Sequence, residues 1–271
     1  MKQPPNTGIR RIEAAFLAAG KRKRAALMPY FTLGYPTISE SAEIISTIAP
    51  ISDLMELGVP FSDPIADGPT IQHSSQLALE NGITVSLCLD LVKSIRSQSI
   101  DVPILLMSYY NPILAYGEER FCKDAHQAGV DGLLVPDLPP EESYNLSQQL
   151  QRLGLALIHF LAPSSSSRRI AAVTSVAQGF IYMVSVTGVT GARKTLDSRL
   201  AAYVKMARER ANLPVAVGFG ISNPEQARAV GDIADGVIIG SKLIDVVDSS
   251  DDKPSAALNM LTAVNQALLL T

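Results

Sequence analysis

Short apolar runs alternate with longer segments of helical period along this chain of 271 residues, and this alternation predicts an α/β fold. Several of the runs are nearly continuous hydrophobic stretches, as parallel strands covered on both faces should be. Eight runs fit into about 250 residues with no Gly/Ser linker or charge block between them. We therefore predict a single domain over residues 1–271, a closed (β/α)8 TIM barrel with an extra N-terminal helix, in preference to a doubly wound sheet.

The predicted elements follow in order along the chain. An amphipathic helix comes first. Its apolar face would consist of Ile9, Ile12, Phe16 and Ala19. The eight strands should begin near Ala25, Leu54, Pro103, Gly132, Leu155, Phe180, Pro214 and Gly236. The longest interval, between the second and third strands, contains the Pro- and Gly-rich stretch 58–69, which we interpret as an elaborated loop at the carboxyl end of the barrel, where such barrels place their chemistry.

Composition and charge argue against several classes of function. The net charge is −3 and both signs are spread along the chain, so we expect no surface for nucleic acid or for an anionic membrane. No run approaches the roughly 18 apolar residues needed to span a bilayer, and the start lacks the apolar core of a secretory signal. We expect a cytoplasmic protein, or one of the plastid stroma if it is encoded in an organelle.

The cysteines and histidines suggest neither a disulfide framework nor a metal site. Cys88 and Cys122 are too few and too far apart for a scaffold, which favours a reducing compartment and two buried thiols. His73, His126 and His159 show no metal-ligating spacing, so no metal site is predicted.

Glu56 is the candidate catalytic residue, because it is a carboxylate within the apolar run 54–57. Burying an ionised carboxylate is unfavourable unless the group is paired or its pKa rises. At the end of the second strand, Glu56 would lie at the mouth of the barrel. The alternative is a structural glutamate bonded to an arginine or a backbone amide.

Glycine-rich loops follow the last three predicted strands, in the segments 186–191, 218–222 and 240–241. Glycines let a ligand approach the backbone, and amides at helix starts can hold a phosphate without Lys or Arg. We therefore predict a phosphate site there, as is common in this fold. Ser222 and Glu225 are expected to form a capping box on the following helix.

An apolar and aromatic lining is predicted between the acids and the glycine loops. Its members are Tyr30, Met107, Tyr109, Leu134, Tyr182 and Phe219. Singly each residue is typical of barrel core, but together they would fit a flat aromatic substrate that carries a phosphate. Asp137, after the fourth strand, would either orient a loop near the site or cap the helix that follows Pro139-Pro140.

Four segments resemble the motifs of the tryptophan synthase alpha chain family. They are residues 29–36, 56–69, 186–191 and 218–222, of which 56–69 is the most specific, and the similarity runs over nearly the whole chain. The resemblance implies a lyase that cleaves indole-3-glycerol phosphate into indole and glyceraldehyde 3-phosphate. It also implies a tryptophan synthase beta chain as partner in an alpha2-beta2 tetramer. Pyridoxal phosphate would belong to that beta chain, with no cofactor in this one.

The resemblance also implies residue roles. Glu56 would be the general acid/base and Asp67 the carboxylate that hydrogen-bonds the indole nitrogen, so the pKa of Glu56 should be raised while Asp67 stays ionised. Thr190 would lie in a mobile loop that closes on Asp67. The implied pocket for the indole consists of Tyr182 and Phe219 with Tyr30, Met107 and Leu134; the implied phosphate site consists of Gly191, Gly220, Gly240 and Ser241.

Two departures from the family pattern and two alternative functions remain. Tyr30 replaces a phenylalanine found in some members, and Val186-Thr187 stands where some bacterial chains have Arg-Ser, so we expect different loop contacts. A free-standing lyase without a beta chain is one alternative; the segment 60–64, part of the family's partner surface, favours the partnered enzyme. The other is a catalytically silent subunit that binds a phosphate ligand, against which the retention of both Glu56 and Asp67 argues.

Overall fold

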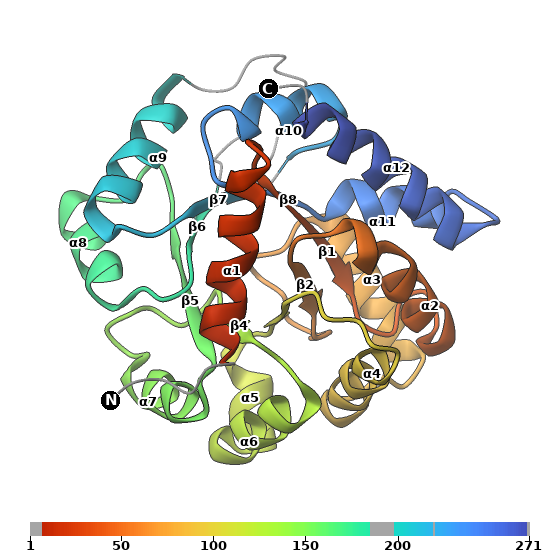
Figure 1. Cartoon of the computed structure of the whole chain (residues 1–271). Helices are drawn as coiled ribbons and strands as arrows, with labels where there is room; N and C mark the ends of the chain where they lie inside the picture. Colours follow the sequence, from red (N-terminus) through yellow and green to blue (C-terminus); the bar gives the residue numbers. More distant parts are fainter. Residues whose placement is uncertain (1–6, 185–197, 219, 270–271) are drawn as a thin grey trace.

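The computed structural model describes residues 7–184, 198–218 and 220–269. Its strands are all parallel and close into a barrel in sequence order, with the last strand pairing back to the first (Figure 1). The strands are β1 Ala26–Thr32, β2 Met55–Gly58, β3 Ile104–Met107, β4 Gly132–Leu134, β5 Ala156–Leu161, β6 Ile181–Val184, β7 Val215–Gly218 and β8 Gly236–Ile239. Each begins within one residue of its predicted start, so the (β/α)8 barrel is confirmed.

Helices surround the barrel, and two of them, α3 and α4, fill the long interval between β2 and β3 (Figure 1). The helices are α1 Gly8–Lys21, α2 Ile38–Ile48, α3 Pro69–Glu80, α4 Val85–Ser97, α5 Tyr110–Tyr116, α6 Glu118–Ala128, α7 Tyr144–Leu153, α8 Ser167–Val176, α9 Ser198–Ala211, α10 Pro224–Gly231, α11 Ser241–Asp248 and α12 Lys253–Leu268; a single 3-10 turn, η1, spans Ala49–Ile51.

The core has two parts, because successive side chains of a strand point to opposite faces. One set of strand residues fills the barrel interior, among them Met28, Leu54, Leu105, Leu134 and Ile238. The alternate set packs outward against the helices, among them Phe31, Leu57, Leu106, Leu133 and Val217. This alternation points Tyr30 and Glu56, which are register partners, into the barrel above Met28 and Leu54.

Helix α1 closes the amino end of the barrel, which it crosses in the centre of Figure 1. The predicted apolar face is confirmed, since Ile9, Ile12, Phe16 and Ala19 are all buried. The ring of Phe16 packs on that of Phe180 with 5.3 Å between centroids. With this end plugged, the carboxyl end is the open one.

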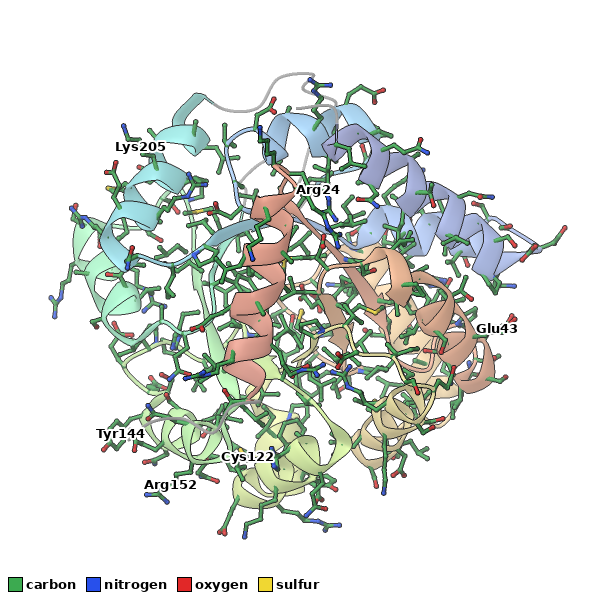
Figure 2. All side chains as sticks on the ribbon, viewed as in Figure 1. Arg24, Glu43, Cys122, Tyr144, Arg152 and Lys205 are labelled. Atoms are coloured by element: carbon green, nitrogen blue, oxygen red, sulfur yellow. The ribbon has the colours of Figure 1, made fainter. Side chains whose placement is uncertain are left out.

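Three aspartates tie the strands together at the amino end. Asp53, Asp131 and Asp235 each precede a strand and accept the backbone N–H at the start of a neighbouring strand, at 2.8 Å in all three cases. Each also pairs with arginine: Arg24 with Asp53, Arg11 and Arg96 with Asp131, and Arg208 with Asp235. Arg24, labelled in Figure 2, lies between α1 and β1. The carboxylates therefore satisfy otherwise unpaired strand amides while sharing their charge with guanidinium groups.

The thiols, the lengths of the helices and the placement of metal-ligating side chains complete the description. Cys88 and Cys122 are buried free thiols, as predicted. Within the described ranges no helix is long and apolar enough to cross a membrane, and no group of three or more His, Cys, Asp or Glu side chains is placed to hold a metal.

The predicted cap of α10 is wrong by one residue. Asn223 is the N-cap, and its side chain accepts the amide of Gln226 at 2.8 Å. Pro224 occupies the first helical position and restricts the residue before it to the extended backbone that an N-cap adopts. Ser222 instead donates through its amide and hydroxyl to the Gln226 side chain.

Candidate active site

Glu56 lies inside the barrel on β2, with 1% of its surface exposed. Its Oε2 has no hydrogen-bond partner among the described residues. Burial, and then the neighbouring charge of Asp67, raise the pKa of Glu56 to about 8. No arginine ion pair accounts for this carboxyl within the described ranges, so the geometry favours a functional over a structural glutamate.

Asp67 approaches the same space from the loop between β2 and α3. Its backbone is fixed on both sides, because its N–H donates to the Pro64 carbonyl and its carbonyl accepts from the Gln72 side chain, both at 3.0 Å. Burial raises the pKa of Asp67 to about 6, against the hydrogen bond from Tyr109, which lowers it. The predicted order of the two carboxyls holds, although the pKa of Asp67 is raised as well.

Tyr30 and Tyr182 are buried beside these acids. The pKa of each hydroxyl is raised, first by burial and also by the charges of Glu56 and Asp67, so all four groups converge at the carboxyl end. Each tyrosine hydroxyl sits over a glycine at a strand end, because a Cβ on Gly58 would overlap the Tyr30 hydroxyl and one on Gly218 would overlap that of Tyr182. Glycine at these positions makes room for the two rings.

A chain of hydroxyls runs from Tyr30 to helix α3. The Tyr30 hydroxyl lies 3.5 Å from Thr32 Oγ1, which lies 2.7 Å from Ser74 Oγ, and Ser74 donates to the Ile71 carbonyl at 3.0 Å. Thr32 and Ser74 are fully buried. The chain attaches α3, which begins two residues after Asp67, to the strand that carries Tyr30.

Tyr109 is the contact that reasoning from the sequence missed. It was expected only in the apolar lining, but its hydroxyl donates to Asp67 Oδ2 at 3.1 Å and accepts the Ala66 amide at 2.9 Å. A separation of 42 residues hides this pair from any local pattern. The one usable signal was that β2 and β3 are neighbours in a barrel. Asp137 accepts the Tyr110 amide at 2.9 and 3.2 Å and thus holds the start of α5, whereas the N-cap of the helix after Pro139-Pro140 is Ser143.

The apolar candidates lie on adjoining strands. Leu134 is buried at the end of β4, and half-buried Met107, its register partner, ends β3. Leu134 belongs to the interior cluster that also contains Tyr182, and Met107 packs against that cluster. Phe219, the remaining aromatic candidate, lies outside the described residues.

The candidate phosphate residues follow two adjacent strands. Gly240 comes after β8 and is the N-cap of α11, and Ser241 is the first residue of that helix. Gly220, after β7, has a φ of +78°, which glycine adopts without strain. The start of α11 suits an anion, because helix N-termini present backbone N–H groups and its first turn has no acidic side chain. Thr190 and Gly191 lie outside the described residues.

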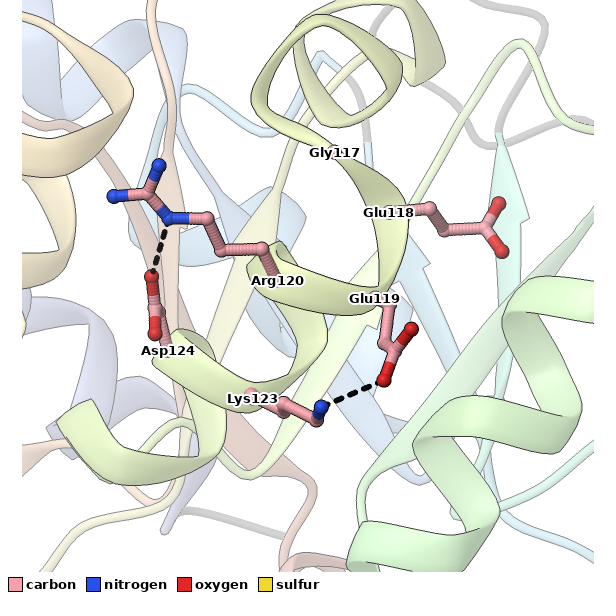
Figure 3. Close-up of a pocket in the computed structure, with 6 residues that line it drawn as sticks. All are labelled: Gly117, Glu118, Glu119, Arg120, Lys123 and Asp124. Atoms are coloured by element: carbon pink, nitrogen blue, oxygen red, sulfur yellow. Dashed lines mark hydrogen bonds and ion pairs between the residues drawn. The ribbon is translucent and has the colours of Figure 1, made fainter.

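A cavity of about 550 Å³ elsewhere on the surface lacks this chemistry (Figure 3). It lies at the start of α6, and four of its charged side chains pair with each other, Lys123 with Glu119 and Arg120 with Asp124. Its lining residues are Gly117, Glu118, Glu119, Arg120, Lys123 and Asp124.

His159, buried on β5, has a pKa lowered to about 4 by burial, so this imidazole is neutral near pH 7.

A (β/α)8 barrel whose open end holds one buried and one half-buried carboxyl group of unequal pKa defines the class as an enzyme of acid–base chemistry. Comparison with known proteins agrees and is more specific. Residues 16–269 match the family described as tryptophan synthase alpha chain. The chain is 51% identical over 235 residues to the tryptophan synthase alpha chain of Geobacter sp. strain M21, which covers 86% of this chain and 88% of that one.

Solved structures give the same result. The tryptophan synthase alpha chain of Legionella pneumophila superposes with a TM-score of 0.87 at 33% identity, over 95% of this chain and 97% of that chain. A chain of the tryptophan synthase complex from Pyrococcus furiosus gives 0.82 at 31% identity, over 88% and 97%. The chain belongs to the tryptophan synthase alpha chain family. It is therefore a lyase of tryptophan biosynthesis, which cleaves indole-3-glycerol phosphate to indole and glyceraldehyde 3-phosphate.

Proposed function

We propose that Glu56 and Asp67 divide the acid–base work of indole-3-glycerol phosphate cleavage between them. The observation that carries this proposal is the convergence of two carboxyl groups, of pKa about 8 and about 6, at the open end of the barrel. Near pH 7 the first is mainly protonated and the second mainly ionised. One is thus an acid and the other a negative charge at the same moment.

Each step of the cleavage then has a group to perform it. Protonated Glu56 delivers its proton to indole C3, which creates a cationic indoleninium, and ionised Asp67 stabilises the charge that grows at the ring N–H. The bond between C3 and the glycerol carbon breaks, and its electron pair restores the aromatic ring. The proton of the adjacent hydroxyl returns to Glu56 as the aldehyde forms, so the products balance without a cofactor.

The remaining residues would bind the two ends of the substrate. The indole would lie among Tyr182, Tyr30, Met107 and Leu134, with Phe219 as a further member. The phosphate would rest on the amides of Gly220, Gly240 and Ser241 with Gly191, and Thr190 would close over Asp67. What supports this arrangement is that the described aromatic residues line the interior next to Glu56, while the glycines follow β7 and β8.

A tryptophan synthase beta chain is the proposed partner, in an alpha2-beta2 tetramer whose pyridoxal phosphate belongs to the beta chain. Two observations support it: the similarity to a chain of a tryptophan synthase complex, and two large apolar side chains exposed on the segments that follow β2 and β3. Ile65 is 84% exposed on the Asp67 loop, and Leu114 on α5 is 51% exposed. An apolar partner surface would cover both.

The acid–base assignment is tested with Glu56→Gln and Asp67→Asn, assayed for indole release from indole-3-glycerol phosphate. Each should lower kcat/KM by about 10²- to 10⁴-fold, the usual contribution of a positioned proton donor or a charge stabiliser. Glu119→Gln, the same exchange on exposed α6, should leave the rate unchanged. Activity near wild type in Glu56→Gln would eliminate the mechanism.

Adding a beta chain separates the partnered enzyme from its alternatives. Stimulated turnover and a complex on size exclusion are expected. Turnover without stimulation or complex would indicate a free-standing lyase. Complete absence of turnover, even with a beta chain that binds, would indicate a silent ligand-binding subunit.

A further inference from the structure

We propose that Tyr109 is a positioning residue that keeps Asp67 ionised and aimed at the substrate. This inference rests on the proposed role of Asp67 and adds a residue that the family resemblance did not assign. Its basis is the pair of hydrogen bonds that the Tyr109 hydroxyl makes to the Asp67 loop.

The direction of these two bonds is fixed by the number of protons. The Ala66 N–H can only donate, so the Tyr109 oxygen accepts it at 2.9 Å. The single hydroxyl proton is then available for Asp67 Oδ2 at 3.1 Å. A phenol that donates to Oδ2 favours the ionised carboxylate over the protonated acid, because protonation removes acceptor capacity. Oδ1 remains for the substrate.

Tyr109 is itself held from the side of β3. Its side chain is nearly fully buried, and its ring lies against Phe61, with 5.4 Å between centroids. The next amide, of Tyr110, donates to the Asp137 carboxylate, and the Val59 amide donates to the Met107 carbonyl at 2.8 Å. The hydroxyl is therefore a fixed point to which the Asp67 loop is attached at both Ala66 and Asp67.

Among the titratable groups that act on Asp67, none could replace the hydrogen bond from Tyr109. The titratable groups that act with it are Glu56 from β2, Tyr30 from β1, Tyr182 from β6 and Tyr109 itself. None of these is a cation, and among the described residues Tyr109 is the neighbour that lowers the Asp67 pKa against the effect of burial. Without that hydroxyl the pKa of Asp67 should move toward that of Glu56, so the difference between the two carboxyls should narrow.

Tyr109→Phe tests the inference, because it removes the hydroxyl and keeps the ring on Phe61. In the pH profile of kcat/KM, the acid limb that reports Asp67 should move up by about one pH unit, the size of one hydrogen bond to an ionised group. The alkaline limb that reports Glu56 should stay in place. At pH 6 the rate should fall several-fold as a result.

Two matched controls exist on helix α5, whose tyrosines bond to carboxylates of α6. The Tyr110 hydroxyl donates to Glu118, and the Tyr116 hydroxyl donates to Asp124 at 2.7 Å. Tyr110→Phe and Tyr116→Phe remove the same kind of bond away from Asp67, so both limbs should remain as in wild type. If Tyr109 only stabilised the fold, Tyr109→Phe would lower the melting temperature without moving the acid limb of its pH profile, and this result would contradict the inference.

A direct titration makes the test independent of turnover. The carboxyl ¹³C signal of Asp67, identified by its disappearance in Asp67→Asn, should titrate about one unit higher in Tyr109→Phe. An unshifted titration or an unmoved acid limb would overturn the inference. If Asp67→Asn itself retained full activity, the proposed role of Asp67 would fail instead, whatever the titration showed.

Discussion

The two ends of the barrel hold buried carboxyl groups in contrasting surroundings. At the amino end, Asp131 receives two guanidinium groups and the Ile104 amide at 2.7 to 2.8 Å. At the carboxyl end, Glu56 is buried as deeply, but its Oε2 has no partner among the described residues. Burial raises the pKa of both, yet two arginines act against it at Asp131, whereas a second acid reinforces it at Glu56.

The difference shows that partners, and not depth of burial, separate a structural carboxylate from a reactive one in this fold. A paired charge holds neighbouring strands together and has little tendency to exchange its proton near neutral pH. An unpaired acid beside a like charge destabilises the fold but is ready to transfer a proton. Removing a carboxylate should therefore destabilise the protein at the amino end and stabilise it at the carboxyl end.

The largest effect on stability is expected at the amino end, from Asp131→Ala. Leaving Arg11 and Arg96 without their shared carboxylate should lower the free energy of unfolding by about 3–5 kcal/mol, the usual result of breaking a buried pair. Urea denaturation measures this loss, and kcat per folded molecule should be unchanged. Asp101→Ala, which removes an exposed partner of Arg11, serves as the control and should cost less than about 1 kcal/mol. Equal losses in the two variants would contradict the comparison.

At the carboxyl end, removing the buried carboxyl group of Glu56 should raise the stability of the protein instead of lowering it, and the size of this change should depend on pH. The folded pKa of Glu56 is about 8, above the value of an exposed glutamate. A raised folded pKa means that the folded protein retains a proton which the unfolded chain releases. Stability should therefore fall between about pH 4.5 and 8 and level off above that, by a few kcal/mol in all.

Glu56→Gln should abolish that part of the pH dependence, because the amide does not titrate. The variant should thus match wild type near pH 4.5, exceed it in stability at pH 9, and be inactive at both. Unfolding curves at closely spaced pH values measure the slope. A variant whose slope equals that of wild type would show that Glu56 is not the group responsible.

Smaller consequences are expected from two glycines. Gly58→Ala would drive a Cβ into the Tyr30 hydroxyl and should destabilise the protein by roughly 1–3 kcal/mol, with reduced activity because Tyr30 lies beside Glu56. Gly20→Ala on α1 meets no atom within 4 Å and should stabilise the helix by about 0.5–1 kcal/mol, with activity unchanged. Thermal unfolding with parallel assays compares the two. Similar effects at both positions would mean that the Tyr30 ring can move aside.

The sequence could predict whatever depends on local periodicity. The strand starts, the buried face of α1 and the inward position of Glu56 all follow from alternation along single elements. Contacts between distant elements were not predictable in this way. Arg11 and Asp131 are 120 residues apart, and Tyr109 and Asp67 are 42 apart, so only the closed barrel brings each pair together. The cap at Asn223 was missed for a local reason, since the effect of Pro224 on the preceding residue outweighs the capping-box pattern.

The smallest effect should come from the partly exposed counterpart of the Asp131 network. Arg208 and Asp235 repeat its geometry, with an ion pair at 2.8 Å and the Val215 amide also at 2.8 Å, but their side chains are 43% and 35% exposed. Water screens this pair, so Arg208→Gln should lower the free energy of unfolding by less than about 1 kcal/mol, whereas Arg96→Gln, at a side chain only 16% exposed, should cost about 2 kcal/mol or more. Urea denaturation in low and high salt measures the free-energy difference between wild type and each variant. This difference should shrink with salt for Arg208→Gln and stay constant for Arg96→Gln. The two ion pairs have similar distances and differ in exposure. Equal losses of stability in the two variants would therefore mean that hydrogen-bond geometry, and not the burial of charge, determines how much the amino-end aspartates stabilise the fold.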